Sequence, residues 1–309
     1  MEHARRTLEK PVPLVNPAFA MDSMEPSSKP LAAEALRFAL YNRFLKGEAK
    51  IPQMPEAQLR IRRLLSDPRS SLEQLARVIN ADPPLAAYLM QFADSPLLRG
   101  SRPCASLRDV LARLGTRRLG NLVFSFGVRN LYIGKEPALQ RLFRARWKAA
   151  LERAAFSAIL AQHSQVADVD DAMLGGLLQD VGSLPLLAEL ERWPHYPREP
   201  EALQQLCEWL SGDIGVVIMT VWKLPTVMIE CARQRTHWAR QHDGAADLAD
   251  LVQVAHHLRD PQLAAESLQR LPAFDRLSAV CPMLRQPADA LRALLTEEAA
   301  LWQRLLGGR

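Results

Sequence analysis

The chain has 309 residues, of which 48% are hydrophobic and 24% charged, and its formal net charge is +5. Such a chain can bury a substantial core, and its composition excludes the disordered and low-complexity classes of protein. The longest apolar run, residues 214–222, is too short to span a bilayer, and the N-terminus lacks the layout of a secretory signal peptide. We therefore expect a cytoplasmic protein without membrane association.

Residues 1–30 differ in composition from the rest of the chain. They contain five prolines with Ser, Asn and Met between them and no helical period, which predicts a flexible proline-rich leader. Beyond them the periodic segments are rich in Ala, Leu, Arg, Glu and Gln, and strand-like alternation is hard to find. The sequence therefore predicts an all-α fold, a multi-helix bundle with an N-terminal helical subdomain.

The first predicted helices lie close together in the chain. One starts at Leu31 and ends near Gly47, and the prolines of residues 51–55 lead into a second. Ser70 and Glu73 then match a capping box, in which each residue bonds the backbone N–H of the other. We therefore expect a third helix to begin at this point.

Three further signals mark helix ends before residue 130. Asp82 followed by Pro83 supplies an N-cap and a first-turn proline. Ser106 and Asp109 match another capping box, and Gly115 closes the helix that they begin. A further helix is expected directly after Gly115, so this part of the chain should consist of short helices on tight turns.

The second half of the chain is predicted to form longer helices. Leucines and valines recur at spacings of three and four through residues 174–187, which predicts a helix that lines a core. Within it, Gly175, Gly176 and Gly182 would let other backbones approach closely. The amphipathic segment 287–306 either packs back on the domain or binds a partner, and we favour packing. The predicted helices cover residues 137–163, 171–187, 202–222, 226–238, 246–258 and 287–306.

Several stretches carry a family resemblance. The sequence LARVINADPPLAAYLMQFADSPLLRG, followed by SLRDVLARLGTRRLGNLV, resembles the N-terminal half of the HDOD family, the HD-related output domains of bacterial signalling proteins. The sequence GLLQDVG at residues 176–182 resembles the GLLHD[IV]G signature of the HD metallophosphohydrolase superfamily. A glycine seven residues before a W-x-LP turn, at Gly215 and Trp222, extends the resemblance, which covers residues 50–258 in all. It implies a helical bundle of HD-domain type.

The resemblance also implies a division of the chain. The expected segments are a leader (residues 1–30), the N-terminal helical half of an HDOD domain (31–130), a degenerate HD-like helical half (131–258) and a C-terminal helical extension (259–309).

Active members of the HD superfamily hold one or two divalent ions with histidines and carboxylates, and the resemblance places those positions in this chain. Ala149, Gln179 and Ser211 stand where histidines are expected, and His256 stands where the distal aspartate is expected. Only Asp180 is retained. An amide is a weak ligand, alanine offers none, and one carboxylate does not hold a transition metal against water. We therefore expect no metal and no enzymatic activity.

Other chemical motifs are absent from the sequence. Phosphate-binding, dinucleotide-binding and nucleophile-elbow patterns are missing, so no cofactor is expected. The cysteines include no CxxC pair and no histidine at zinc-finger spacing, and we interpret them as buried reduced thiols. They are Cys104, Cys207, Cys231 and Cys281.

Positive charge is concentrated in two stretches. Residues 99–118 and 129–153 each carry a net charge of +5, which leaves the rest of the chain at about −5. Such stretches could attract a nucleotide, nucleic acid or another acidic partner, but we favour the interpretation that long arginine stems solvate helix faces. Specific DNA binding is not expected, because the residues after Arg118 have core character. The candidate anion- or partner-binding residues are Arg113, Arg117, Arg118, Arg141, Arg144 and Arg146.

We interpret the chain as a non-catalytic HDOD-type signalling or regulatory module that acts through protein–protein or ligand binding in bacterial signal transduction. The resemblance implies links with two-component or cyclic-di-GMP networks. The expected partners are unidentified signalling proteins, or else a cyclic dinucleotide or another anionic ligand. Two alternatives stay open. One is a divergent metal-dependent phosphohydrolase or phosphodiesterase that uses Asp180, His237 and His256. The other is an arginine-lined nucleotide or nucleic-acid binding module.

Overall fold

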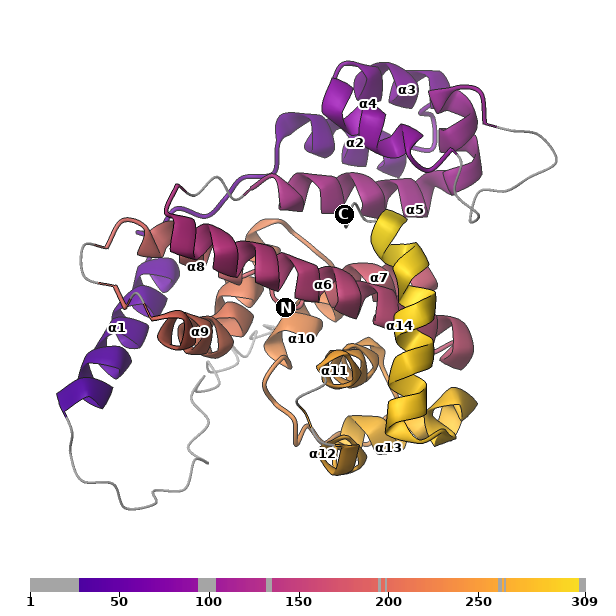
Figure 1. Cartoon of the computed structure of the whole chain (residues 1–309). Helices are drawn as coiled ribbons and strands as arrows, with labels where there is room; N and C mark the ends of the chain where they lie inside the picture. Colours follow the sequence, from indigo (N-terminus) through magenta and orange to yellow (C-terminus); the bar gives the residue numbers. More distant parts are fainter. Residues whose placement is uncertain are drawn as a thin grey trace, which may run out of the picture. The chain divides into compact units, whose positions relative to one another are not determined.

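The computed structural model describes residues 28–93, 104–131, 135–193, 196–197, 199–260, 263 and 265–305. Within these ranges every regular element is a helix and no strand occurs, so the predicted all-α fold is confirmed (Figure 1). Most of the expected leader, residues 1–27, lies outside them. The chain divides into two units, residues 1–36 and 37–309. No helix in the described part of the chain is long and apolar enough to cross a membrane.

The bounds of the helices, in chain order, are α1 (Ser28–Leu45), α2 (Glu56–Ser66), α3 (Leu72–Asn80), α4 (Pro83–Met90), α5 (Leu107–Arg129), α6 (Pro137–Ser164), α7 (Val169–Leu178), α8 (Ser183–Leu190), α9 (Pro200–Val221), α10 (Thr226–Arg233), α11 (Leu248–Arg259), α12 (Ala265–Gln269), α13 (Pro272–Val280), a 3-10 helix (Pro282–Arg285) and α14 (Ala288–Leu305). The first of these helices begins before Leu31, where order was expected to start.

Helices α2 to α5 pack on one another, and local caps set their ends. The Asp82 carboxylate accepts a hydrogen bond from the N–H of Leu85, and Ser106 forms a capping box with its partner three residues on, so both predicted caps are confirmed. The predicted box at Ser70 is wrong by one residue, because Ser71 is the cap and bonds Gln74. Two overlapping serine-x-x-acceptor patterns occur here, and the backbone uses the second.

Gly115 breaks α5 at the predicted place. Its backbone angles are φ 71° and ψ 170°, a conformation that residues other than glycine rarely adopt. The residues on either side are helical, so two shorter helices run through α5 with a kink between them. Leu119, Leu122 and Val123 in the second part are buried, as expected of core residues.

The predicted helix through residues 174–187 is wrong in one respect that matters for the site. Helix α7 ends at Leu178 and α8 begins at Ser183, so Gln179 and Asp180 lie in the turn between them. Gly182 lets this turn approach α9, because a Cβ there would collide with the backbone of Ser211 and Gly215. The helical spacing of apolar residues continues across the turn, so the sequence pattern did not reveal the break between the two helices.

Helix α6 is the longest element and packs along α7, with α9, α11 and α14 also against it (Figure 1). Gly176 of α7 makes the closest approach, since a Cβ there would lie 2.9 Å from the Cα of Ala154 in α6. This contact brings the inward face of α6 against the turn that follows α7. Arginines on that face therefore meet the residues of the turn.

The W-x-LP turn after α9 contacts the group formed by α2 to α5, and so connects it with the group of helices around α6. The guanidinium of Arg62 in α2 donates to the carbonyl oxygens of Trp222 and Lys223, each at 3.1 Å. The indole N–H of Trp222 donates to the carbonyl of Pro52 at 3.0 Å. Lys223 has a positive φ of 55°, a backbone conformation that is uncommon for residues other than glycine.

Candidate functional site

Four of the five positions that the resemblance singled out meet around the turn between α7 and α8. Gln179 Oε1 lies 2.9 Å from His256 Nδ1 of α11, and the hydroxyl of Ser211 in α9 donates to Asp180. All four side chains are buried. Ala149 lies on α6, one turn from each of two buried arginines, and its methyl group offers no ligand atom.

Both oxygens of the retained carboxylate are occupied. Arg146 Nη2 lies 2.7 Å from Asp180 Oδ2, and Arg235 Nε lies 3.0 Å from Oδ1. The hydroxyl of Ser211 donates to Oδ1 at 2.5 Å. Burial raises the pKa of Asp180, but the neighbouring guanidiniums outweigh it and hold that pKa well below its usual value. Asp180 is therefore an ionised carboxylate held by two cations and a hydroxyl.

The same two arginines also hold a second carboxylate, that of Glu208 in α9. Arg146 Nη1 donates to Glu208 Oε1 at 3.0 Å, and Arg235 Nη2 donates to Oε2. Burial raises the pKa of Glu208, but the guanidinium charges lower it further than burial raises it. The Glu208 side chain is 43% exposed, whereas that of Asp180 is only 7% exposed. Each guanidinium thus bridges an inner carboxylate and an outer one.

A third arginine lies behind this pair. Arg153 is 2% exposed, and its Nε donates to the carbonyl of Gly176 at 2.6 Å. Burial lowers its pKa, Asp180 raises it, and the positive charges of the neighbouring arginines lower it. No carboxylate lies at ion-pair distance from it among the described residues. Three guanidiniums therefore face two carboxylates, which leaves one positive charge in excess.

Several buried donors around this centre have no hydrogen-bond partner within the described part of the chain. They are Arg146 Nε, Arg153 Nη2, Gln179 Nε2 and the hydroxyl of Ser157. Arg235 Nε is within ion-pair distance of Asp180 but is not aligned for a hydrogen bond. Buried donors are nearly always satisfied in folded proteins, so this concentration is unusual. The centre has more hydrogen-bond donors than the protein supplies acceptors.

His256 is neutral. Burial lowers its pKa well below the ordinary value, and the charges of Arg153, Arg235 and Arg259 lower it further. Trp238 packs against the imidazole edge-on, with ring centroids 5.3 Å apart. In this arrangement the ring donates its Nδ1 hydrogen to the amide oxygen of Gln179. His237, which one alternative placed in the same site, is exposed, and its imidazole lies 2.9 Å from the carbonyl of Arg233.

These residues do not fit a divalent metal ion. Ala149 has no ligand atom, and Gln179 and Ser211 offer only neutral oxygens. The remaining carboxylate, Asp180, is already paired with two permanent cations, and a metal ion would be repelled by both. The donor set that HD enzymes use is replaced here by arginine–carboxylate pairs.

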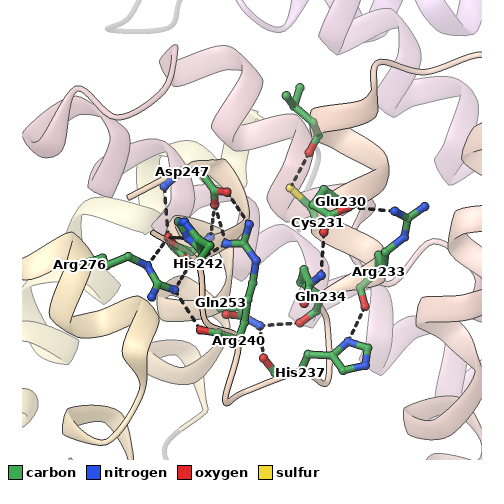
Figure 2. A network of polar contacts seen from close by, with 12 residues as sticks. Glu230, Cys231, Arg233, Gln234, His237, Arg240, His242, Asp247, Gln253 and Arg276 are labelled. Carbon is green, nitrogen blue, oxygen red and sulfur yellow. Dashed lines mark hydrogen bonds and ion pairs between the residues drawn. The ribbon is translucent and has the colours of Figure 1, made fainter. Parts of the chain in front are cut away.

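A second polar network surrounds Asp250, and sequence reasoning did not predict it. His242, Asp247 and Asp250 place ligand atoms within 4.8 Å of one another, a spacing that a metal ion could use. Figure 2 shows Arg240, His242 and Arg276 converging at this point. Because the two guanidiniums already hold the carboxylates, this cluster does not fit a metal ion either.

Asp250 has no solvent exposure and four sources of hydrogen bonds. Arg240 Nη1 donates to Oδ1 at 2.8 Å, Arg276 donates to both oxygens at 2.7 and 2.9 Å, and His242 Nε2 lies 2.9 Å from Oδ2. The backbone N–H of Asp247 supplies the fourth. Burial would raise the pKa of Asp250, but the hydrogen bonds from Arg276 and His242 lower it to about 2. The network ties the loop after α10 to α11 and α13.

The six arginines predicted to bind an anion or a partner have different surroundings. Arg117 Nη1 lies 2.8 Å from Asp171, and Arg118 Nε lies 2.8 Å from Asp170, both at the start of α7. Arg146 is buried in the network already described. Arg113 is half-buried, and Arg141 and Arg144 are exposed on α6.

Sequence reasoning did not single out Arg153, Glu208 or Arg235 as site residues, although Arg153 lies in the basic stretch 129–153. One signal was available for the arginines of α6. Arg146 and Arg153 share the helical face of Ala150 and Ala154, both of which are buried. An arginine within an apolar stripe has to find a buried acceptor. Arg235 gave no such signal, because it lies in an irregular segment after α10.

Solved structures show where else this fold occurs. A protein from Shewanella amazonensis SB2B, provisionally assigned as a metal-dependent phosphohydrolase, superposes with a TM-score of 0.75 at 20% identity, over 87% of this chain and 99% of the other. An HDOD domain protein of unknown function from Geobacter sulfurreducens gives a TM-score of 0.61 at 21% identity, over 88% and 99% of the two chains. The expected HD-type helical fold is confirmed.

Sequence comparison agrees with the structures. An uncharacterized protein from Treponema pallidum (strain Nichols) is 24% identical over 195 residues, which are 59% of this chain and only 37% of that protein. The chain thus matches just over a third of the length of this relative. The family model of the HDOD domain matches residues 51–238, which include the turn at Asp180, both of its arginine partners and Glu208. The chain therefore belongs to the HDOD family.

Proposed function

We propose that the protein is a non-catalytic signalling module that regulates other molecules by binding them. Membership of the HDOD family supports the signalling role. The observation that supports the non-catalytic part is the pairing of Asp180 with Arg146 and Arg235. The carboxylate that would anchor a metal ion is held instead by two fixed cations.

The physical reason lies in the cost of exchanging these partners. A divalent ion could bind Asp180 only if both guanidiniums moved away, and each would then need another buried acceptor. The histidines that repay this cost in an HD enzyme are replaced by Ala149, Gln179 and Ser211. The bundle thus keeps the shape of an HD domain while arginines supply the positive charge at its centre.

The partner is proposed to be another protein of a bacterial signalling network, and a cyclic dinucleotide is the alternative ligand. The W-x-LP turn offers a route between the two groups of helices, because Arg62 and Trp222 connect them directly. A partner that displaced this turn would change the contact of α2 with α9. We propose such a coupling as the way in which binding is passed on.

Metal content and hydrolysis test the non-catalytic part. The full chain, purified without a metal-affinity tag, is incubated with Mn²⁺, Fe²⁺ or Zn²⁺, dialysed and assayed on a model phosphodiester. We expect no retained metal and no hydrolysis in the wild type or in Asp180→Asn. The matched control is Asp243→Asn, which removes an exposed carboxylate. Hydrolysis that Asp180→Asn abolishes and Asp243→Asn preserves would show that the protein is a divergent phosphohydrolase.

A second candidate function rests on the exposed face of α6. Arg141, Arg144 and Lys148 are exposed at helical spacings of three and four, so they share one side of the helix. Such a basic stripe suits an acidic partner or nucleic acid. Arg144→Glu should weaken such binding and reduce its salt dependence, whereas Arg117→Glu, at a residue already paired with Asp171, should do so less. Equal effects of the two changes, or none, would remove this candidate.

A further inference from the structure

The outer half of the arginine network differs from the inner half in one physical respect. Asp180 is buried inside the bundle, whereas Glu208 pairs with the same two guanidiniums from the solvent side. A glutamate that is nearly half exposed can rotate into water at the cost of its two ion pairs. When it does so, one Nη group of Arg146 and one of Arg235 become free while both arginines stay anchored to Asp180.

The charge behind this opening is not balanced. Arg153 adds a third guanidinium without a carboxylate at ion-pair distance among the described residues, and its Nη2 is buried with no partner. Arg146 Nε and Gln179 Nε2 are also buried and unpaired. If Glu208 leaves, three guanidiniums face a single carboxylate. The centre then attracts an anion with more than one negative charge and several acceptor oxygens.

We propose that Arg146 and Arg235 form a binding site for a phosphate group, and that the carboxylate of Glu208 occupies this site in the free protein. A phosphate dianion has the charge and the oxygen atoms to replace Glu208, and the freed Nη groups of Arg146 and Arg235 can each donate a charge-assisted hydrogen bond to one of its oxygens. The phosphate is either free inorganic phosphate or the terminal group of a monoester. This inference names a ligand class for the proposed regulatory role and rests on the proposed absence of a metal at Asp180.

Glu208 therefore acts as an internal competitor. Its removal should increase the affinity for phosphate, which is the opposite of what loss of an ordinary ligand residue does. The apparent affinity of the wild type is the intrinsic affinity multiplied by the fraction of time that the site is open, so a site open about a tenth of the time gives about a tenfold lower Kd when Glu208 is removed. A residue with a purely structural role would not produce such a gain.

The test compares Glu208→Gln with Glu230→Gln in the full chain. Glu230 is a matched control, because it also pairs with an arginine, Arg233, but lies outside the network. Each protein is titrated with inorganic phosphate by calorimetry at constant ionic strength, with chloride as the reference salt. We expect Glu208→Gln to bind phosphate more tightly than the wild type, and Glu230→Gln to bind as the wild type does. Arg235→Lys in the Glu208→Gln background should abolish the gain.

A measurement on the unmodified protein guards against variants that do not fold. Phosphate should shift the Nε–H resonances of Arg146 and Arg235 in nitrogen-edited NMR spectra, while the resonance of Arg62, which contacts the turn after α9, stays in place. Repeating the titration with glycerol 2-phosphate separates the two sources, since tighter binding of the monoester than of phosphate assigns the site to an organic phosphate.

Equal phosphate binding by Glu208→Gln and Glu230→Gln, together with unshifted resonances of both arginines, would overturn the inference. If metal content also stays absent, the proposed non-catalytic function survives this failure. If stoichiometric metal is found, both proposals fall together.

Discussion

Asp180 and Asp250 are two buried aspartates that each lie between two guanidiniums, and their surroundings differ in how completely the donors are used. Around Asp250 the arginines, His242 and the N–H of Asp247 all meet acceptors, and Arg240 has Asp247 as a second carboxylate. Around Asp180 one guanidinium is in excess, and several donors have no partner among the described residues.

This difference separates a structural network from a candidate site. A fully satisfied polar network stabilises one arrangement of the chain and gains nothing from a ligand. A buried centre with unpaired donors and surplus charge is costly in isolation, so binding of an anion would stabilise it. The Asp250 network therefore holds α11, α13 and the loop after α10 together, whereas the Asp180 network has the unpaired donors that the proposed phosphate site requires.

The largest expected effect is on the satisfied network. Asp250→Ala should lower the free energy of unfolding by about 3–5 kcal/mol, because it leaves Arg276 in a half-buried site without any carboxylate, while Arg240 keeps only Asp247. Urea denaturation with the matched change Asp243→Ala, at an exposed aspartate, checks this. A loss no larger than that of the control would mean that the network contributes little.

Asp180→Ala should cost less, about 2–3 kcal/mol, although its side chain is also buried. The reason is that Arg146 and Arg235 retain Glu208 as a partner when Asp180 is removed. The comparison with Asp250→Ala in the same denaturation experiment decides the point. A cost that exceeds that of Asp250→Ala would show that Glu208 does not compensate Arg146 and Arg235 for the loss of Asp180.

The hydroxyl of Ser211 offers a finer test of the Asp180 network. Ser211→Ala removes a hydrogen bond to a charged group and should cost about 1.5–3 kcal/mol at most. Ser157 is the matched control, since its hydroxyl is also buried near the centre but has no partner, and Ser157→Ala should be close to neutral. Equal costs for the two changes would contradict the assigned partners.

His256 gives the smallest effect and a pH dependence of known sign. Its pKa is lowered in the folded state, so below the ordinary value of 6.5 the unfolded chain binds a proton that the folded chain does not. Stability should therefore fall as the pH drops below 6.5, by at most about 1.4 kcal/mol per pH unit. His256→Gln should flatten the slope between pH 7 and 5, and His163→Gln, at an exposed histidine, should leave it unchanged.

The fold could be predicted largely from local signals. Asp82 and Ser106 each cap a helix through bonds to residues three positions on, and such bonds depend only on neighbouring sequence. The error at Ser70 arose because Ser71 fits the same pattern one residue later. The turn at Gln179 was missed for a different reason. The break between α7 and α8 depends on the contact of Gly182 with the backbone of α9, which lies far away in the sequence.

The site was predicted by position and not by chemistry. The replaced ligands Gln179 and Ser211 do lie together, because the family resemblance fixes their places in the fold. The partners of Asp180 could not be foreseen, since Arg146 and Arg235 come from segments far apart in the sequence and meet only when α6 packs along α7 and α9 along α10. Arg146 was among the predicted anion- or partner-binding residues, and the phase of α6 places it in the buried network.

The most direct test of the central claim is the metal content of the full chain after incubation with Mn²⁺, Fe²⁺ and Zn²⁺ and exhaustive dialysis. If Arg146 and Arg235 stand in for the metal as the positive partners of Asp180, elemental measurement should find no stoichiometric ion in the wild type or in Asp180→Asn. Stoichiometric metal in the wild type that disappears in Asp180→Asn would contradict this account, because it would show that the carboxylate exchanges its guanidiniums for a metal ion.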